Sequence, residues 1–405
     1  MKILTILILL FPTSLAQAQT IADKKFIKTN APIFLFDGFS NFSAAFPNEK
    51  SNFEQKNSLV VGNDSQIFFR TGIKTSNQAK YGAIAKIEFN FNTANSTKKN
   101  ENPNLDQAFL FAENSLGKFE LGNFQAVNQK MKTGAAKLAR GAGGINGKYL
   151  ENVNLPNSSF ILLAQSPIGH GSFARGDYLN FNRTSFRALK DDSFDGVEDA
   201  AKISYYTPRI EGVQIGASYT PNSSNSGFTS TKYYNSKAIK IINIASFGAN
   251  YSQDFDNLGL EISTTAEQGK VKNYDAQNRS NLFSYDFGAT LSYFGFSVGA
   301  SYGDWKKSLQ QKNVAQKNGN SQYSTAAISY AFGPIATSLT ALKSTFEKNN
   351  YQAISLGVDY KLARDLMPYF EVSKFAFKSA SNSVTNSNIK DNQGYIFLTG
   401  VLISF

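Results

Sequence analysis

The chain has 405 residues, of which 41% are hydrophobic and 18% are charged, and its net charge of +11 is spread along the sequence without an Arg-rich block, which argues against nucleic-acid binding. It contains no Cys and one His, His170, which excludes disulfide frameworks, thiolate metal sites and motifs that need two histidines. A slightly negative mean hydropathy, without an apolar run of about 20 residues, excludes a helical membrane protein.

The N-terminus has the three parts of a secretory signal peptide. Lys2 supplies the positive charge, residues 3–11 are almost entirely apolar, and Ala16-Gln17-Ala18 forms an A-x-A cleavage site. The apolar run of about 9 residues is too short to cross a bilayer as a helix. We therefore predict cleavage after Ala18, with residues 1–18 as the signal peptide and 19–405 as the exported chain.

The rest of the chain alternates apolar and polar residues with a period of two, which is typical of β-strands. Between Phe283 and Tyr293, every odd position is apolar and every even position is Ser, Asp, Gly or Thr. A soluble sandwich would alternate in the same way. Polar faces rich in Gly, Ser and Thr, aromatic residues near strand ends, and short turns that alternate with long polar loops favour a membrane barrel.

The alternation predicts an all-β fold, a transmembrane antiparallel β-barrel of sixteen strands with short periplasmic turns and long extracellular loops. Segment 157–183 is ambiguous, and a further strand at 160–164 with a partner would make eighteen strands. The predicted strands are 33–43, 64–74, 80–91, 105–113, 117–124, 199–207, 211–220, 240–252, 256–267, 282–293, 294–304, 322–332, 335–346, 351–362, 366–377 and 393–405.

The last strand ends in Phe405, and Tyr395, Phe397 and Ile403 share its face. This ending resembles the C-terminal signal of bacterial outer-membrane proteins, which is read by the barrel-assembly machinery. Leu398 departs from that signal, because a polar residue is usual two positions before the Gly. We predict Phe405 as part of the assembly signal, and therefore an outer-membrane location in contact with lipid.

Four parts of the chain carry a family resemblance: Phe36-Asp37-Gly38-Phe39, residues 107–112 with 117–122, the strand, Pro-containing turn and strand of 202–221, and the terminal strand. With these, the chain as a whole resembles the general porins of Gram-negative bacteria, in the form common in alphaproteobacteria. The resemblance implies a sixteen-stranded barrel, a homotrimer, passive diffusion of small ions and hydrophilic solutes, and a third long loop that folds into the lumen.

By strand counting, the third long loop is 126–198, and we predict it as the constriction loop. Its basic first part and acidic last part would set up a transverse field across a pore. A solvated surface loop is the alternative, and the acidic part could instead hold Ca²⁺, although its spacing does not match an EF-hand. The loop charges are Lys130, Lys132, Lys137 and Arg140, followed by Asp191, Asp192, Asp195, Glu198 and Asp199 at the acidic end.

Alternation also assigns the charged strand residues to the lumen, because a charge on the lipid face near the midplane would cost about 2–4 kcal/mol. Trp305 lies just past the predicted strand 294–304 on the long-loop side, and we interpret it as an outer-interface residue. The predicted pore-lining residues are Arg70, Lys74, Lys86, Glu88, Lys118, Glu120, Lys202, Asp286 and Asp359.

No recognisable enzyme motif accompanies these charges. Residues 141–148 look like a phosphate loop, but Tyr149 replaces the required Ser or Thr, and His170 lies in a turn-like run. We expect a water-filled diffusion channel without a metal or cofactor, and its basic excess hints at a weak anion preference. The alternatives are a substrate-specific channel, a non-conducting adhesin or structural barrel, and a hydrolase dependent on His170.

Overall fold

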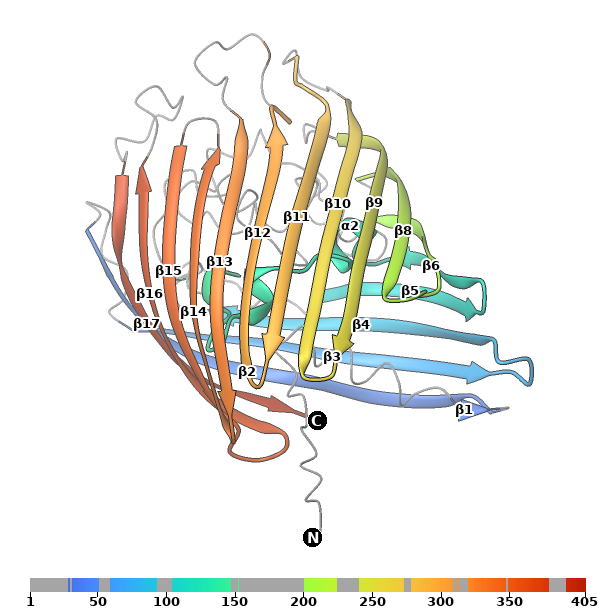
Figure 1. The fold of residues 1–405 in the computed structure, drawn as a ribbon, viewed down its shortest axis with the longest axis horizontal. Helices are drawn as coiled ribbons and strands as arrows, with labels where there is room; N and C mark the ends of the chain where they lie inside the picture. Colours follow the sequence, from blue (N-terminus) through green and yellow to red (C-terminus); the bar gives the residue numbers. More distant parts are fainter. Residues whose placement is uncertain are drawn as a thin grey trace.

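Sixteen consecutive antiparallel strands close into a ring in the computed structural model of the chain (Figure 1). Strand β17 pairs with β2 and closes the barrel, while the short β1 pairs in parallel with β3. The all-β class and the count of sixteen are confirmed. The structure describes residues 28–29, 31–50, 59–92, 104–146, 152, 200–223, 240–272, 278–308, 312, 320–346, 349–378 and 391–405.

The predicted signal peptide, 1–18, and the ambiguous segment 157–183 lie outside the described residues. Within the described part, no helix is long and apolar enough to cross a membrane.

Each predicted strand is present. β2, β3 and β10 extend several residues further toward the long loops than expected, because polar residues such as Asn48, Asn63 and Gln268 continue the pairing there. The strands are β1 (Lys28–Thr29), β2 (Ile33–Glu49), β3 (Val60–Lys74), β4 (Lys80–Asn92), β5 (Asn104–Asn114), β6 (Gly117–Asn123), β7 (Ala201–Tyr206), β8 (Val213–Asn222), β9 (Lys240–Phe255), β10 (Leu258–Lys272), β11 (Leu282–Tyr293), β12 (Phe296–Lys306), β13 (Ser321–Phe332), β14 (Ile335–Phe346), β15 (Asn349–Tyr360), β16 (Leu366–Lys378) and β17 (Asp391–Ser404).

The two faces of the barrel wall differ as the alternation predicts. On β11, Phe287 is 52% exposed on the outer face, whereas the neighbouring Asp286 is 2% exposed on the inner face. Aromatic and aliphatic side chains cover the outside, and Ser, Thr and Gly dominate the inside. An outer surface that is apolar and an inner surface that is polar are what a membrane barrel requires.

The hairpin between β11 and β12 shows why the short turns are tight. Tyr293 pairs with Phe296, and only Phe294 and Gly295 lie between them. Both turn residues have positive φ, 44° and 84°, as a two-residue turn that matches strand twist requires.

The beginning of the first long strand and the end of the last meet at the short-turn side. Gly38 and Phe405 exchange two backbone hydrogen bonds of 3.1 Å, and the Phe405 ring lies 5.8 Å from that of Phe36 on the outer face. This contact joins the two ends of the sheet.

Trp305 is not an outer-interface residue, so that interpretation was wrong. Strand β12 continues to Lys306 instead of ending at 304. Its period of two places Trp305 on the inner face with Ser301 and Gly303, where it is 1% exposed and its ring lies 5.3 Å from that of Tyr323.

Candidate functional site

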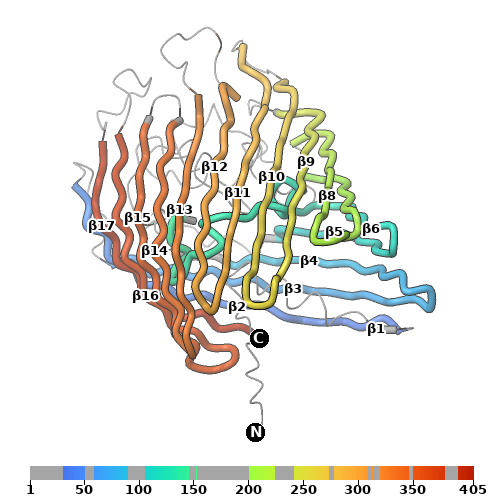
Figure 2. The backbone as a smooth tube through the Cα atoms, viewed as in Figure 1, coloured from blue at the N-terminus to red at the C-terminus, as the bar shows by residue number. Residues whose placement is uncertain are grey.

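Residues 124–146, here called the lumen segment, leave the end of β6 and cross the inside of the barrel (Figure 2). The segment contains the short helices α2 (Val127–Lys130), η1 (Ala135–Leu138) and η2 (Gly144–Asn146). Helix α2 contacts β8 to β10, η1 contacts β11 to β14, and η2 contacts β14 and β15. The segment therefore lies along the inner face of one half of the barrel.

Glycines on the inner wall make room for this segment. A Cβ atom on Gly288 would overlap the carbonyl of Thr133, and one on Gly357 would overlap the carbonyl of Arg140. The alternation of Gly with apolar residues, which suits a wet lumen in the sequence, here provides a surface on which another backbone can lie.

Wall side chains also satisfy the backbone of the lumen segment. Its short helices leave many N–H groups without regular partners, and such groups need acceptors when they are buried. These N–H groups donate to inward side chains of five strands: Val127 to Ser218 (3.2 Å), Thr133 to Ser263 (2.9 Å), Arg140 to Ser338 (2.8 Å), Gly141 to Asp359 (2.6 Å), Gly144 to Glu371 (2.8 Å) and Ile145 to Thr340 (3.3 Å).

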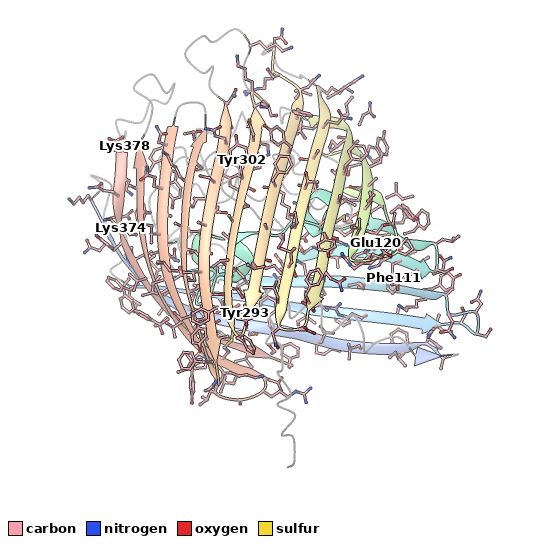
Figure 3. The ribbon with its side chains drawn as sticks, viewed as in Figure 1. Phe111, Glu120, Tyr293, Tyr302, Lys374 and Lys378 are labelled. Carbon is pink, nitrogen blue, oxygen red and sulfur yellow. The ribbon has the colours of Figure 1, made fainter. Side chains whose placement is uncertain are left out.

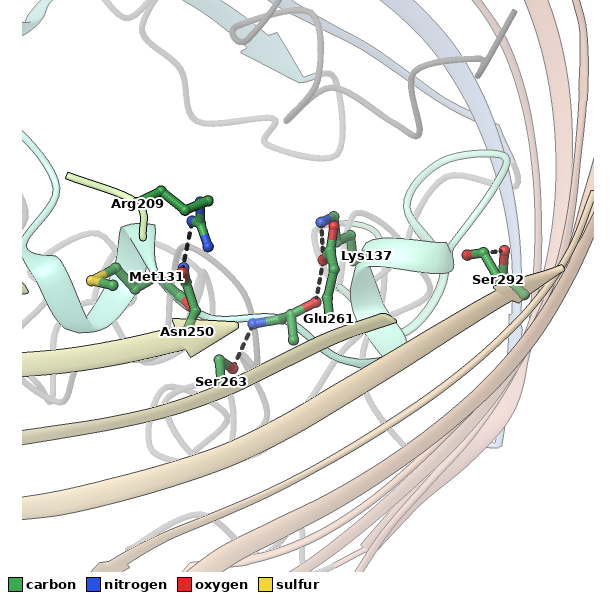
Figure 4. Close-up of polar contacts among 9 residues, drawn as sticks. Met131, Lys137, Arg209, Asn250, Glu261, Ser263 and Ser292 are labelled. Carbon is green, nitrogen blue, oxygen red and sulfur yellow. Dashed lines mark hydrogen bonds and ion pairs between the residues drawn. The ribbon is translucent and has the colours of Figure 1, made fainter. Parts of the chain in front are cut away.

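Strand residues from β8 to β16 therefore fix the segment at several points. Figure 4 shows the middle of this contact, with Ser263 and Glu261 of β10 beside the segment.

Ion pairs add to these hydrogen bonds. The ammonium of Lys132 lies 3.7 Å from the Asp286 carboxylate, and both side chains are almost completely buried. Lys137 pairs with Glu261, and Arg140 lies 3.9 Å from Asp359.

Burial lowers the pKa of Arg140, and the Asp359 carboxylate opposes that shift. Asp286 and Asp359 thus lie on the inner face, as alternation predicts, but the lumen segment covers them.

The other half of the inner wall carries large charged side chains. On β2 and β3, the Arg70 guanidinium lies 3.0 Å from Asp37 and over the ring of Phe68. On β4 and β5, Lys86 pairs with Glu88 at 3.1 Å and also with Asp106.

Lys74 ends β3 opposite Lys80, where Lys80 forms an ion pair with Glu113 at 2.5 Å. The wall from β2 to β5 is therefore lined by paired charges of both signs.

Two lysines converge on one carboxylate where the lumen segment begins. Glu120 of β6, labelled in Figure 3, is 2% exposed and accepts from Lys118 at 2.9 Å and Lys130 at 2.7 Å. Lys202 of β7 is buried and donates to the carbonyl oxygens of Phe124 and Ala200, the latter at 2.6 Å. Lys202 thereby joins the first residue of the segment to the wall.

Several residues of this site were absent from the sequence prediction. Glu261, Glu371, Asp37 and Asp106 lie on the inner face and pair with or accept from the residues above. Glu371 follows Phe370 and precedes Val372, so the same alternation that assigned Asp359 would have found it.

The acidic end of the predicted loop, Asp191, Asp192, Asp195, Glu198 and Asp199, lies outside the described residues, as does His170. In the described part of the chain, no group of three or more His, Cys, Asp or Glu residues is placed to hold a metal ion.

The family model for Gram-negative porins matches residues 4–380. The chain belongs to the Gram-negative porin family. The porin is 29% identical to an uncharacterized protein of Rickettsia conorii, over 84% of this chain and 83% of that protein. A protein of Rickettsia bellii, also uncharacterized, is 28% identical over 91% and 92% of the two chains.

Two solved porins share the fold. An anion-selective porin from Comamonas acidovorans has a TM-score of 0.55 at 12% identity and covers 93% of this chain and 100% of its own. A mutant of the Rh. blastica porin has a TM-score of 0.54 at 13% identity, with 92% and 100% covered. The family and the barrel identify the protein as a porin that forms a channel through the outer membrane, and the family indicates a channel rather than an enzyme.

Proposed function

We propose that small hydrophilic solutes diffuse through the space between the lumen segment and the wall of β2 to β7, with a preference for anions. The anion preference rests on the unequal exposure of opposite charges around Glu120, where the lumen segment begins. Lys118 and Lys130 are 34% and 26% exposed, whereas the carboxylate that they share, Glu120, is 2% exposed. One buried negative charge thus stands behind two accessible positive charges.

On the covered half of the wall, the lumen segment shields carboxylates together with the cations that pair with them. Asp286 and Asp359 are each paired with a cation of the lumen segment and shielded by it. Glu371 accepts from the backbone of Gly144 and is fully buried. Charged groups select ions where they meet the pore, and shielded carboxylates contribute less than exposed ammonium groups. In this proposal, the lumen segment both narrows the channel and hides negative charge.

The test is the reversal potential of the refolded porin in a planar bilayer under a salt gradient. For the wild-type porin, we expect ohmic conductance steps and a reversal potential whose sign indicates anion preference. The double variant Lys118→Gln/Lys130→Gln should move the reversal potential toward cation preference. Lys361→Gln, which removes an exposed lysine after β15, is the matched control and should change nothing. A folded barrel without conductance would contradict the channel, and a cation-preferring wild type would contradict the proposed selectivity.

We further propose a homotrimer in which the outer faces of β2 to β6 meet. A hollow on this face has a floor of small residues, Ala83, Ala85 and Ala108, and exposed apolar side chains around it, Phe34, Phe36, Phe69, Leu110 and Leu121. Such a hollow can receive large side chains of a neighbouring protomer. Phe405, 54% exposed beside this face, is proposed as the signal for the barrel-assembly machinery.

Native mass spectrometry of the porin in detergent tests the trimer. Ala85→Phe fills the hollow and should shift the mass from trimer toward monomer. Ala289→Phe, at an outward position of β11, is the matched control and should leave the trimer intact. A wild-type monomer would contradict the proposal.

A further inference from the structure

Three lysines lie on the outer face of the barrel at the end opposite the short turns. Lys343 of β14 and Lys374 and Lys378 of β16, here called the lysine patch, all lie within the last few residues of their strands. All three are exposed, and Figure 3 labels two of them, Lys374 and Lys378, at the edge of the barrel.

Burial and strand register show that the patch points outward. Ser373 and Phe375, on either side of Lys374, are buried inside the barrel. Lys374 pairs in register with Ile354 and Tyr395, and its ammonium lies 5.4 Å from the centre of the Tyr395 ring. The patch therefore belongs to the surface that faces the membrane and not to the pore.

An apolar band begins beside the patch, level with Lys374, and continues toward the short turns. Ile354, Leu356 and Phe397 are outward and 52%, 48% and 43% exposed. A lysine is unfavourable on the lipid face at the midplane but is tolerated near the interface. The step from apolar band to lysines therefore marks the level where acyl chains give way to headgroups.

The placement of these charges is one-sided. No outward strand position of β2 to β9 whose side chain is described carries a charge, whereas Lys270 and Lys272 of β10 are also outward and exposed at this end of the barrel. On β12, the outward Asp304 is capped by Lys306 at 2.9 Å, and Asp391 pairs in register with Lys378. Lys343 differs, because its register partners are the uncharged Ser324 and Gln352. Positive charge thus exceeds negative charge around Lys343 and Lys374.

We propose that the lysine patch binds the phosphate groups of anionic lipid headgroups in the leaflet on the long-loop side. Lys343 and Lys374 are two strands and two residues apart, a backbone distance of about 12 Å for ordinary strand spacings. Two extended lysine side chains can bracket one headgroup across that distance. The chains of the same lipid would lie on Ile354 and Leu356, and the Tyr395 ring would occupy the boundary between chain and headgroup.

Native mass spectrometry of the whole porin in detergent, with phosphatidylglycerol and phosphatidylcholine in equal amounts, tests the proposal. Wild type should retain phosphatidylglycerol preferentially. The variant K343Q/K374Q should lose about 30-fold of that preference, because each lysine near an anionic surface accounts for about a fivefold factor. K343R/K374R keeps both charges and should keep the preference, and K361Q, at the short-turn end, is the matched control.

Three outcomes would overturn the proposal. One is equal retention of phosphatidylglycerol by K343Q/K374Q and wild type. Another is release of the lipid by millimolar inorganic phosphate, which would indicate a site for the free anion. A third is a change of oligomer mass in K343Q/K374Q without a change in bound lipid, which would indicate a protein interface. Single-channel conductance of K343Q/K374Q should equal that of wild type, because the patch lies outside the lumen, and so shows that the barrel is folded.

Discussion

The two halves of the inner wall differ in the side chains that they present and in what those side chains contact. From β8 to β16, Gly, Ser and Thr form a surface on which the lumen segment lies, and carboxylates there pair with the segment. From β2 to β7, Arg, Lys and Glu side chains occupy the inner face and pair with one another. Small side chains thus mark the wall that the lumen segment covers, and large charged side chains mark the wall from β2 to β7.

The largest effect is expected from removing most of the lumen segment. Replacing residues 131–144 with a short Gly-Ser linker should raise single-channel conductance by about twofold or more, because a constriction controls conduction. It should also shift selectivity toward cations, since Asp286, Asp359 and Glu371 would face the channel. Bilayer recordings with a salt gradient measure both quantities. Unchanged conductance of a heat-modifiable, folded barrel would show that the segment does not limit the pore.

Asp286→Asn removes the carboxylate that faces the buried ammonium of Lys132. Breaking one partner of a buried pair costs about 3–5 kcal/mol of the free energy of unfolding. Urea unfolding of the porin refolded in lipid vesicles measures this loss. The double variant D286L/K132M removes both charges and should recover most of the stability, and a single variant as stable as wild type would refute the role of this pair.

Gly357→Leu places a side chain where the Arg140 carbonyl lies. Overpacking of this kind costs about 1–3 kcal/mol, and we expect the same loss of unfolding free energy together with altered conductance. Gly333→Asn is the control, because Gly333 has open space around it and Asn tolerates its positive φ of 53°. If both variants behave like wild type, the segment does not need the glycine surface.

The smallest effect is expected for an exposed ion pair on the wall from β2 to β7. The Lys80–Glu113 pair has side chains that are 36% and 37% exposed. Glu113→Gln should therefore cost only about 0–1 kcal/mol of unfolding free energy in the same urea assay. A loss as large as that of Asp286→Asn would show that burial does not determine the cost of losing an ion pair on this wall.

Local sequence patterns predicted most of the fold. A period of two extends over nine or more residues in nearly every strand, so strand positions follow from neighbours in the sequence. The orientation of Asp286 and Asp359 follows from the same period. Strand ends were less predictable. Polar residues such as Asn48 and Gln268 continue β2 and β10 toward the long loops, and in the sequence they cannot be told from loop residues.

The site was less predictable, because its contacts join distant residues. Lys132 and Asp286 are both visible as charges, but only the course of residues 124–146 brings them together. In the sequence, nothing distinguishes the glycines that lie against the backbone of the lumen segment from other glycines of the strands. Trp305 was assigned to the outer interface because the predicted strand ended at 304, whereas β12 continues to Lys306 and its period of two places position 305 on the inner face.

The pairing of β17 with β2 also makes closure of the barrel depend on strands from opposite ends of the sheet. Ser404 pairs with Phe39, so closure joins strands that are separated by nearly the whole chain. Without β17, β2 and β16 would both be open sheet edges, which template pairing with other chains. A chain truncated before β17 would therefore leave β2 with an unpaired edge and be prone to aggregate.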